Sequence, residues 1–350
     1  MNKHIAFFKE LIGDYCFSDE LSREGYSHDE TEDIRVMPLC VLKPGTVDEV
    51  SKILTYCNAN QLPVTPMGAR TGLSGGAIPA LNGVALSMER FNRILDIDEN
   101  NHQVTTEPGV ITQVLQETVK EKGLFYPPDP ASKGSCFIGG NVSENSGGPK
   151  AVKYGVTKDY VLNLEVVLAD GNVIWTGANV LKNATGYNLT QLIVGSEGTL
   201  GVVTKIVLKL LPHPTADLLL LVPFHSAKQA CEAVAAIYRK GIVPSGLEFM
   251  ERDAIDWTLQ FVDGLNVTVN EDIQAHLLIE VDGNYPEILM LEAEKIMTVV
   301  EQFQIDDILF ADTEDEKNAL WKMRRSVAEA VKANSIYKEE DTVVPRYELP

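Results

Sequence analysis

Short apolar runs and helically spaced apolar residues alternate in the first two hundred positions. Period-2 or continuous apolar runs predict strands at 39–42, 63–66, 84–88, 94–97, 104–107 and 162–169. Asp170-Gly171 predicts a hairpin to a further strand at 173–175. Apolar residues at helical spacing predict helices at 5–12, 47–57 and 111–121, and Thr46 with Glu49 forms a capping-box pattern before the second. Many short strands and few helices indicate the α+β class.

The pattern changes after residue 215. It predicts, in order, strand 218–224, helix 227–239, strand 243–250, helical insertion 255–261, strand 276–281, helix 288–303 and strand 307–310. This β-α-β-β-α-β order is the split βαβ, or ferredoxin-like, arrangement. A further amphipathic helix is predicted at 314–332. Because Pro212 and Pro214 resist helix and strand alike, we expect an N-terminal arm at 1–35, a first domain at 36–214 and a second at 215–350.

Charge and cysteine content narrow the class of protein. Thirty Lys and Arg against fifty Asp and Glu give a net charge of −20, which argues against binding nucleic acid or anionic membranes. The five cysteines contain no C-x-x-C pair, and the six histidines show no metal-ligand spacing, so neither a disulfide framework nor a metal site is predicted. No apolar run approaches the ~20 residues of a membrane helix. The expectation is a cytoplasmic protein without a membrane span.

Three glycine-rich segments are the candidates for a ligand-binding site. They are 66–76 (PMGARTGLSGG), 127–148 (PPDPASKGSCFIGGNVSENSGG) and 194–204 (VGSEGTLGVVT). Glycines allow positive φ and turn successive backbone N–H groups toward one anion, while Ser and Thr hydroxyls add donors. Each segment alone fits a simple turn, but three of them point to a ligand. None matches G-x-G-x-x-G or a P-loop, so a Rossmann or nucleoside-triphosphate site is not supported.

Together with Glu248-Phe249-Met250 and 320–324 (LWKMR), these motifs resemble the FAD-linked oxidases of the vanillyl-alcohol oxidase type, in the glycolate oxidase and D-lactate dehydrogenase branch. The likeness covers about residues 36–350. It implies a two-subdomain FAD-binding domain and a ferredoxin-like substrate, or cap, domain. The implied reaction is FAD-dependent oxidation of a small D-2-hydroxy acid (D-lactate, glycolate or D-2-hydroxyglutarate class) to the 2-oxo acid, by hydride transfer to flavin N5. The alternatives are a non-catalytic flavin-binding subunit or fragment, and a carbohydrate or aryl-alcohol oxidase on the same fold.

The resemblance also implies roles for individual residues. The first segment would hold the pyrophosphate, the second the flavin and ribityl chain, and the third the adenine or ribose. The residues so assigned to FAD are Gly68, Arg70, Thr71, Gly72, Leu73, Ser74, Gly75, Pro128, Asp129, Ser135, Gly139, Asn141, Asn145, Gly147, Gly148, Glu197 and Val203. Arg70 departs from the G-A-G-T-G of the family, and a role on the diphosphate and a position in solvent both stay open. No histidine occurs between Leu62 and Asn101, so the FAD is expected to be non-covalent.

For the substrate, the resemblance assigns its carboxylate to Arg324, with Lys338 as a second candidate. No general base can be named. Relatives continue past a V-P-R-x-x-L-P segment like 344–350 into a histidine motif that supplies a metal site and the base. We therefore expect the chain to be a fragment, incomplete in its second domain, and a divalent metal only if a longer chain supplies ligands. The expected partners are a small anionic substrate, an electron acceptor whose identity stays open (oxygen, a quinone or a protein) and a second copy in a homodimer.

Overall fold

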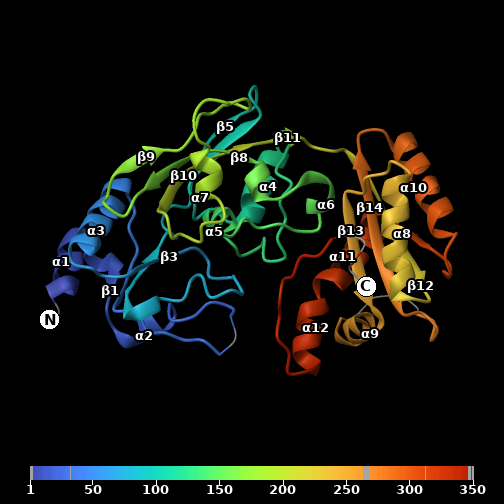
Figure 1. Ribbon diagram of the computed structural model, residues 1–350, viewed down its shortest axis with the longest axis horizontal. Helices are drawn as coiled ribbons and strands as arrows, with labels where there is room; N and C mark the ends of the chain where they lie inside the picture. Colours follow the sequence, from blue (N-terminus) through green and yellow to red (C-terminus); the bar gives the residue numbers. More distant parts are fainter. Residues whose placement is uncertain (1–2, 32, 263–268, 312, 346–347, 349–350) are drawn as a thin grey trace. The chain divides into compact units, whose positions relative to one another are not determined.

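The computed structural model describes residues 3–31, 33–262, 269–311, 313–345 and 348 (Figure 1), and part of the 344–350 segment lies outside them. Contacts divide the chain into two compact units, 1–147 with 156–213, and 148–155 with 214–350. The linking prolines lie at this division. Residues 148–155 belong to the second unit, although the sequence suggested that they were part of the first domain. Their positively charged side chains, described below, explain this assignment.

The first unit begins with a mixed four-stranded sheet in the order β1-β2-β4-β3. β2 and β3 both run parallel to β4, so β2, α3 and β3 form the predicted β-α-β unit. Thr46 caps α3 by accepting a hydrogen bond from the Glu49 N–H at 3.2 Å, while the Glu49 carboxylate reaches back to the Gly45 N–H at 2.6 Å. The elements of this half are α1 (Lys3–Ile12), η1 (Gly13–Tyr15), β1 (Cys16–Phe17), α2 (Glu20–Glu24), β2 (Cys40–Leu42), α3 (Val47–Ala59), β3 (Val64–Met67), η2 (Ala80–Asn82) and β4 (Val84–Ser87).

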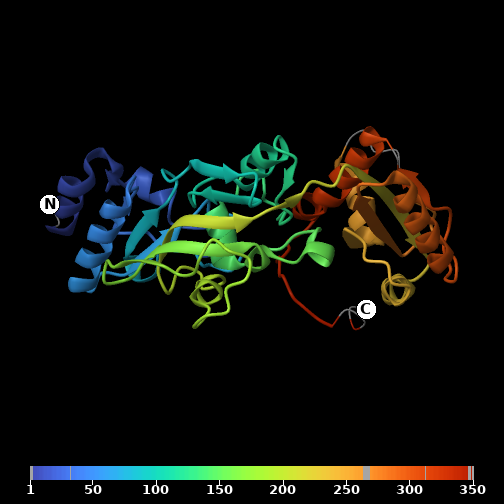
Figure 2. The same ribbon diagram turned by 90° about the horizontal axis from the view of Figure 1, so that it is seen from above.

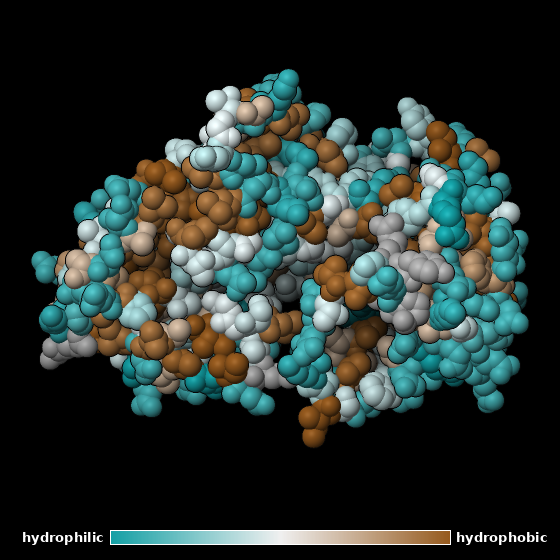
Figure 3. Space-filling view, in the orientation of Figure 1, coloured by the Kyte–Doolittle hydropathy of each residue, from teal (hydrophilic) through white to brown (hydrophobic). Residues whose placement is uncertain are grey.

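An antiparallel five-stranded sheet, β5-β6-β10-β8-β9, completes the first unit. One apolar core joins the two sheets, because Val167 and Val202 of the second sheet pack with residues of α1, α3 and the first sheet. β9 is an edge strand, and its Val173 and Trp175 are exposed. In Figure 3, apolar surface gathers over this part of the first unit. The elements are β5 (Ile94–Asp98), β6 (Gln103–Thr106), α4 (Thr112–Lys120), β7 (Leu124–Phe125), α5 (Ile138–Glu144), η3 (Thr157–Asp159), β8 (Val161–Val167), β9 (Val173–Trp175), α7 (Leu189–Ile193), β10 (Val202–Lys209) and β11 (Leu211–Pro212).

The N-terminal residues differ from the expected peripheral arm. Phe8 is fully buried and Ile12 is 6% exposed, and both belong to the core cluster of the first unit. The apolar face of α1 therefore packs on α3 and the first sheet. The two buried apolar side chains of α1 decide this packing.

The second unit is a ferredoxin-like antiparallel sheet in the order β13-β14-β12-β15. Helices α8 and α10 cover one face, and α9 and α11 pack on the other (Figure 2). The helix predicted at 314–332 is broken at Ser326, whose N–H closes the end of α11 on the Lys322 and Met323 carbonyls. The elements are α6 (Ala151–Tyr154), β12 (Ala216–Phe224), α8 (Ala227–Arg239), β13 (Gly246–Glu251), α9 (Arg252–Phe261), β14 (Ala275–Gly283), α10 (Pro286–Val300), β15 (Leu309–Ala311), α11 (Glu314–Arg325) and α12 (Val327–Asn334).

Candidate functional site

The three glycine-rich segments meet around α5 in the first unit. The first segment lies against it, because a Cβ placed at Gly68 would be 3.6 Å from the backbone of Gly140. The third is hydrogen-bonded to it, through the Gly195 N–H to the Val142 carbonyl (2.9 Å) and the Glu197 N–H to the Ser143 carbonyl (3.0 Å). Segments separated by more than fifty residues in the sequence therefore form one site.

The loop after β3 presents unpaired backbone donors. Within the part of the chain that the structure describes, the N–H groups of residues 69–76 donate no hydrogen bond to the protein. Gly75 has φ +78°, which side chains rarely adopt, and Arg70 has φ +61°. Polar N–H groups normally find partners. A run of them that curves through two positive φ values is the arrangement of an anion-binding nest.

The second segment supports this loop mainly through packing. A Cβ at Gly139 would lie 2.4 Å from the Pro108 Cβ, and the Gly139 N–H donates to the Pro108 carbonyl at 2.7 Å. Only glycine allows this approach. Asn141 is 2% exposed, and its amide donates to the Thr112 hydroxyl at 2.5 Å. Its role here is to fix α5 on α4.

The other predicted cofactor residues have varied surroundings. Asn145 ends α5 in the left-handed conformation, with its side chain accepting from the Lys158 N–H at 2.9 Å. The Ser135 hydroxyl donates to the Ser132 carbonyl at 3.2 Å, and the Pro128 carbonyl accepts from Gln116 at 2.9 Å. Val203 is 8% exposed within the five-stranded sheet. Asp129 is buried, Gly147 ends the first-unit part of the segment, and Gly148 belongs to the second unit.

Three carboxylates lie near the loop, and the sequence singled out only one of them, Glu197. A Cβ at Gly76 would lie 3.0 Å from Glu144 Oε1 and 3.3 Å from Glu197 Oε2. The buried Asp29 accepts from the Ala77 N–H at 3.4 Å and the Thr31 N–H at 2.9 Å. Partial burial, and then the negative charges of Glu197 and Asp29, raise the pKa of Glu144. The anion-binding loop thus lies in negative surroundings.

The third segment also borders a cavity of about 200 Å³. Its walls come from α3, the start of β3 and residues 198–202, and they are mostly apolar, including Leu54, Leu62 and Val64.

In the second unit, Arg324 lies on α11 and pairs with Glu248 of β13. Its Nε donates to Glu248 Oε2 at 2.6 Å, and the two side chains are 35% and 15% exposed. Among the described residues, Nη1 and Nη2 of Arg324 have no hydrogen-bond acceptor. Glu248 therefore fixes the plane of the guanidinium and leaves its outer fork accessible. Lys338 is exposed and pairs with Glu340 at 2.5 Å.

Residues 148–155 reach a row of carboxylates on β14 through two lysines. Lys150 forms an ion pair with Glu280 and lies 3.5 Å from Asp282, while Lys153 and the Tyr154 hydroxyl donate to Asp282 Oδ1 at 2.7 and 2.8 Å. Glu280 and Asp282 are 4% and 5% exposed, so these charges are paired away from water.

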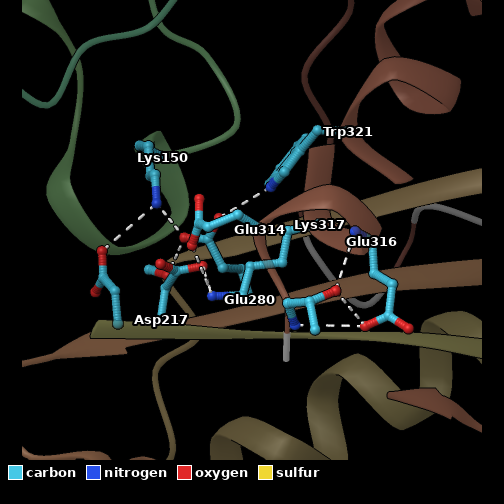
Figure 4. A network of polar contacts seen from close by, with 10 residues as sticks. Lys150, Asp217, Glu280, Glu314, Glu316, Lys317 and Trp321 are labelled. Atoms are coloured by element: carbon cyan, nitrogen blue, oxygen red, sulfur yellow. Dashed lines mark hydrogen bonds and ion pairs between the residues drawn. The ribbon is translucent and has the colours of Figure 1, made fainter. Parts of the chain in front are cut away.

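Glu280 has two further partners, both uncharged. Ser245 Oγ donates to Glu280 Oε1 at 2.7 Å and Trp321 Nε1 donates to Oε2 at 3.1 Å (Figure 4). Nearby, Lys317 of the same helix as Trp321 pairs with Asp217 at 3.1 Å. One end of the sheet face that α11 covers therefore carries a polar network, which α11 and the 148–155 segment hold in place, beside the apolar core of that face.

Family matches cover nearly the whole chain. Residues 38–177 match the FAD binding domain, and residues 213–350 match the C-terminal domain of FAD linked oxidases. The glycolate oxidase subunit GlcD of Bacillus subtilis is 42% identical over 344 residues, which are 97% of this chain and 72% of that protein. The D-lactate dehydrogenase of Anaerostipes hadrus is 38% identical, over 98% of this chain and 72% of its own length. The chain belongs to the FAD-linked oxidase family.

Solved structures agree with this membership at the level of fold. A p-cresol methylhydroxylase structure with bound substrate has a TM-score of 0.75 at 20% identity, over 91% of this chain and 68% of that one. An alkyldihydroxyacetonephosphate synthase has a TM-score of 0.79 at 17% identity, and the chain spans 64% of it. The predicted α+β fold, the FAD cofactor and the oxidoreductase class are confirmed.

The residues present in this FAD-linked oxidase fit the cofactor. The unpaired N–H groups of residues 69–76 suit a diphosphate, and the apolar cavity beside residues 198–202 suits a flat base. The structure also bears on metal ligands and membrane-spanning helices. The described part of the chain contains no cluster of three or more His, Cys, Asp or Glu side chains arranged for a metal, and none of its helices is both long and apolar enough to cross a membrane.

Proposed function

We propose that this FAD-linked oxidase oxidises a small D-2-hydroxy acid to the 2-oxo acid. The observation that carries the proposal is the accessible guanidinium fork of Arg324, oriented by Glu248, in a protein of net charge −20. An anionic substrate needs a local cation in such a protein, and a guanidinium binds a carboxylate through two parallel hydrogen bonds. Glycolate and D-lactate are named as substrates of the two relatives described above.

Each segment receives a proposed role. The loop of residues 68–76 holds the diphosphate of FAD through its N–H groups, and residues 128–148 lie along the flavin and ribityl chain. Glu197 and Val203 lie toward the adenine or ribose. Arg324 binds the substrate carboxylate and Lys338 is a second candidate for this role. The cofactor is bound without a covalent link, because the first segment and its flanks contain no histidine.

Bound FAD supplies the two-electron acceptor for the substrate. The chain's own residues orient the acid: Glu248 holds Arg324 Nε, which leaves Nη1 and Nη2 to grip the carboxylate and fix the carbon that carries the hydroxyl. Loss of this grip would therefore lower turnover as well as substrate binding.

Spectroscopy of the purified protein tests the proposal. We expect a yellow protein whose flavin is released entirely by acid precipitation, and flavin left in the pellet would refute non-covalent binding. Anaerobic D-lactate, glycolate or D-2-hydroxyglutarate should bleach the flavin of the purified protein. If dithionite bleaches it and none of these acids does, the protein binds flavin without oxidising hydroxy acids.

The cellular setting is also a proposal. All five cysteines are buried and unpaired by disulfides, which suits the reducing cytoplasm. A homodimer and an electron acceptor of unspecified kind complete the expected partners.

A further inference from the structure

Arg70 is a conformational outlier within the diphosphate loop. Its φ of +61° is one that non-glycine residues rarely adopt, and the family pattern has glycine at this position. Glycine would take the same conformation without a steric cost. Retention of a side chain at a strained position suggests that the side chain itself has a use.

The guanidinium of Arg70 stacks on a ring and, among the described residues, contacts no carboxylate. Its Cζ lies 4.1 Å from the centre of the Tyr26 ring. Tyr26 is fixed in turn, because its hydroxyl donates to Glu89 Oε2 at 2.6 Å. Lys43, the other cation near this ring, already pairs with Glu89 Oε1 at 2.6 Å.

Arg70 differs from Lys43 in having no such partner. Among the described residues, its guanidinium makes no ion pair and donates no hydrogen bond. Stacking uses only the flat face of a guanidinium, so the N–H edge stays available. The side chain is therefore oriented, and its charge is uncompensated.

The charges around the loop supply the reason for a cation. Glu144, Glu197 and Asp29 all approach residues 75–77, and FAD adds a diphosphate of the same sign. Arg70 is the only Lys or Arg in the segment 66–76. Backbone N–H groups alone would have to hold the diphosphate against three carboxylates.

We propose that Arg70 is the cation that allows this carboxylate-rich loop to bind the FAD diphosphate, with Tyr26 holding the guanidinium face and the N–H edge meeting the phosphate oxygens. The inference rests on the proposed function, since it takes FAD as the ligand of the loop. Of the two roles that the sequence left open for Arg70, it takes the diphosphate contact over a position in solvent.

Arg70→Gly is the informative variant, because glycine allows the positive φ of the loop and removes the side chain that carries the guanidinium. The measurements are the dissociation constant of FAD, from quenching of flavin fluorescence on addition of apoprotein, and the melting temperature of the apoprotein. We expect Arg70→Gly to bind FAD about 10- to 100-fold more weakly, the range for loss of a charged hydrogen bond. Arg70→Lys should recover part of the affinity. Arg239→Gln, which removes an exposed charge at the end of α8, should bind as the unaltered chain does.

The melting temperature separates a ligand contact from a structural role. A loss of FAD affinity in Arg70→Gly with an apoprotein melting temperature unchanged to within about 2 °C supports the proposal. Equal FAD affinity in Arg70→Gly and the unaltered chain overturns it and leaves the proposed function intact. A loss of affinity that accompanies a lower apoprotein melting temperature also overturns it, because Arg70 would then stabilise the loop. If the unaltered chain binds no FAD, the proposed function fails together with this inference.

Discussion

Lys150 should contribute to the stability of the second unit far more than an ordinary lysine. It pairs with Glu280 and lies near Asp282, and the three side chains are only 18%, 5% and 2% exposed. In Lys150→Met the apolar stem is kept and the charge is lost, so Glu280 retains only the neutral donors of Ser245 and Trp321. Breaking a buried pair costs ~3–5 kcal/mol. We expect about 3 kcal/mol, since these donors and Lys153 still serve the carboxylates.

The assay can be confined to the second unit. In a Trp175→Phe background the remaining tryptophans, Trp257 and Trp321, both belong to that unit, so their fluorescence follows its unfolding. A loss of about 3 kcal/mol in a unit of this size lowers the melting temperature by roughly 6–12 °C. Lys228→Met is the matched control. Its Nζ lies 3.9 Å from Glu232, with side chains 75% and 36% exposed, and such a pair contributes at most ~0.5 kcal/mol.

A double variant shows whether the loss comes from an unpaired charge. Adding Glu280→Gln to Lys150→Met leaves an uncharged side chain that can still accept from Ser245 and Trp321. Most of the lost stability should return, because no uncompensated carboxylate then remains buried. Equal melting temperatures for Lys150→Met and Lys228→Met would refute the reasoning. So would a double variant less stable than Lys150→Met alone.

Three other predictions follow from single residues. Gly75→Val should abolish FAD binding, because a β-branched residue cannot easily adopt φ +78°, and normal flavin affinity in this variant would make the loop a mere turn. Arg324→Ala should lower turnover of D-2-hydroxy acids at least about tenfold while FAD stays bound, whereas Lys322→Ala, at an exposed position, should leave turnover unchanged. Equal turnover in Arg324→Ala and the unaltered protein would return Arg324 to a surface role. Burial, and then the charge of Arg252, lower the pKa of His276 from 6.5 to about 4. Between these pH values the imidazole is protonated in the unfolded chain and neutral in the folded one. The free energy of unfolding should therefore fall by about 3 kcal/mol as the pH drops from 6.5 to 4. In urea titrations at pH 6.5 and 4, His276→Gln should show little of this fall. An equal fall in His276→Gln and in the unaltered protein would contradict the prediction.

The elements with regular apolar spacing could be predicted from the sequence, and those built by tertiary contacts could not. The β-α-β-β-α-β order of the second unit is confirmed, strand by strand. It could be predicted because apolar residues recur in each element at the spacing typical of its helix or strand. Helix α5 was not predicted, since Gly139, Gly140 and Asn141 are poor helix formers. Its first turn is fixed instead by long-range bonds from Ile138 and Gly139 to the Val110 and Pro108 carbonyls.

One missed element did have a readable signal. Val202–Lys209 is the central strand β10 of the five-stranded sheet, and four of its eight residues are Val or Ile, with a further β-branched Thr. Its first three residues are also the last three of the third glycine-rich segment, so they were interpreted as part of a loop. The carboxylates of Asp29 and Glu144, in contrast, have no motif of their own, and only the folded chain brings them to the loop.

The two arginines of the candidate sites illustrate two ways in which an acidic protein can keep a cation available for an anion. Arg324 is held at Nε by the Glu248 carboxylate, which partly compensates the positive charge of its guanidinium. Arg70 is held by the uncharged ring of Tyr26, and no carboxylate of the described residues pairs with it. A substrate must bind and leave in each turnover, so a partly compensated guanidinium suits it. A cofactor that stays bound can use the stronger, uncompensated charge, and the surrounding carboxylates make that charge necessary. The difference between the two arginines therefore matches the different residence times expected of a substrate and of FAD.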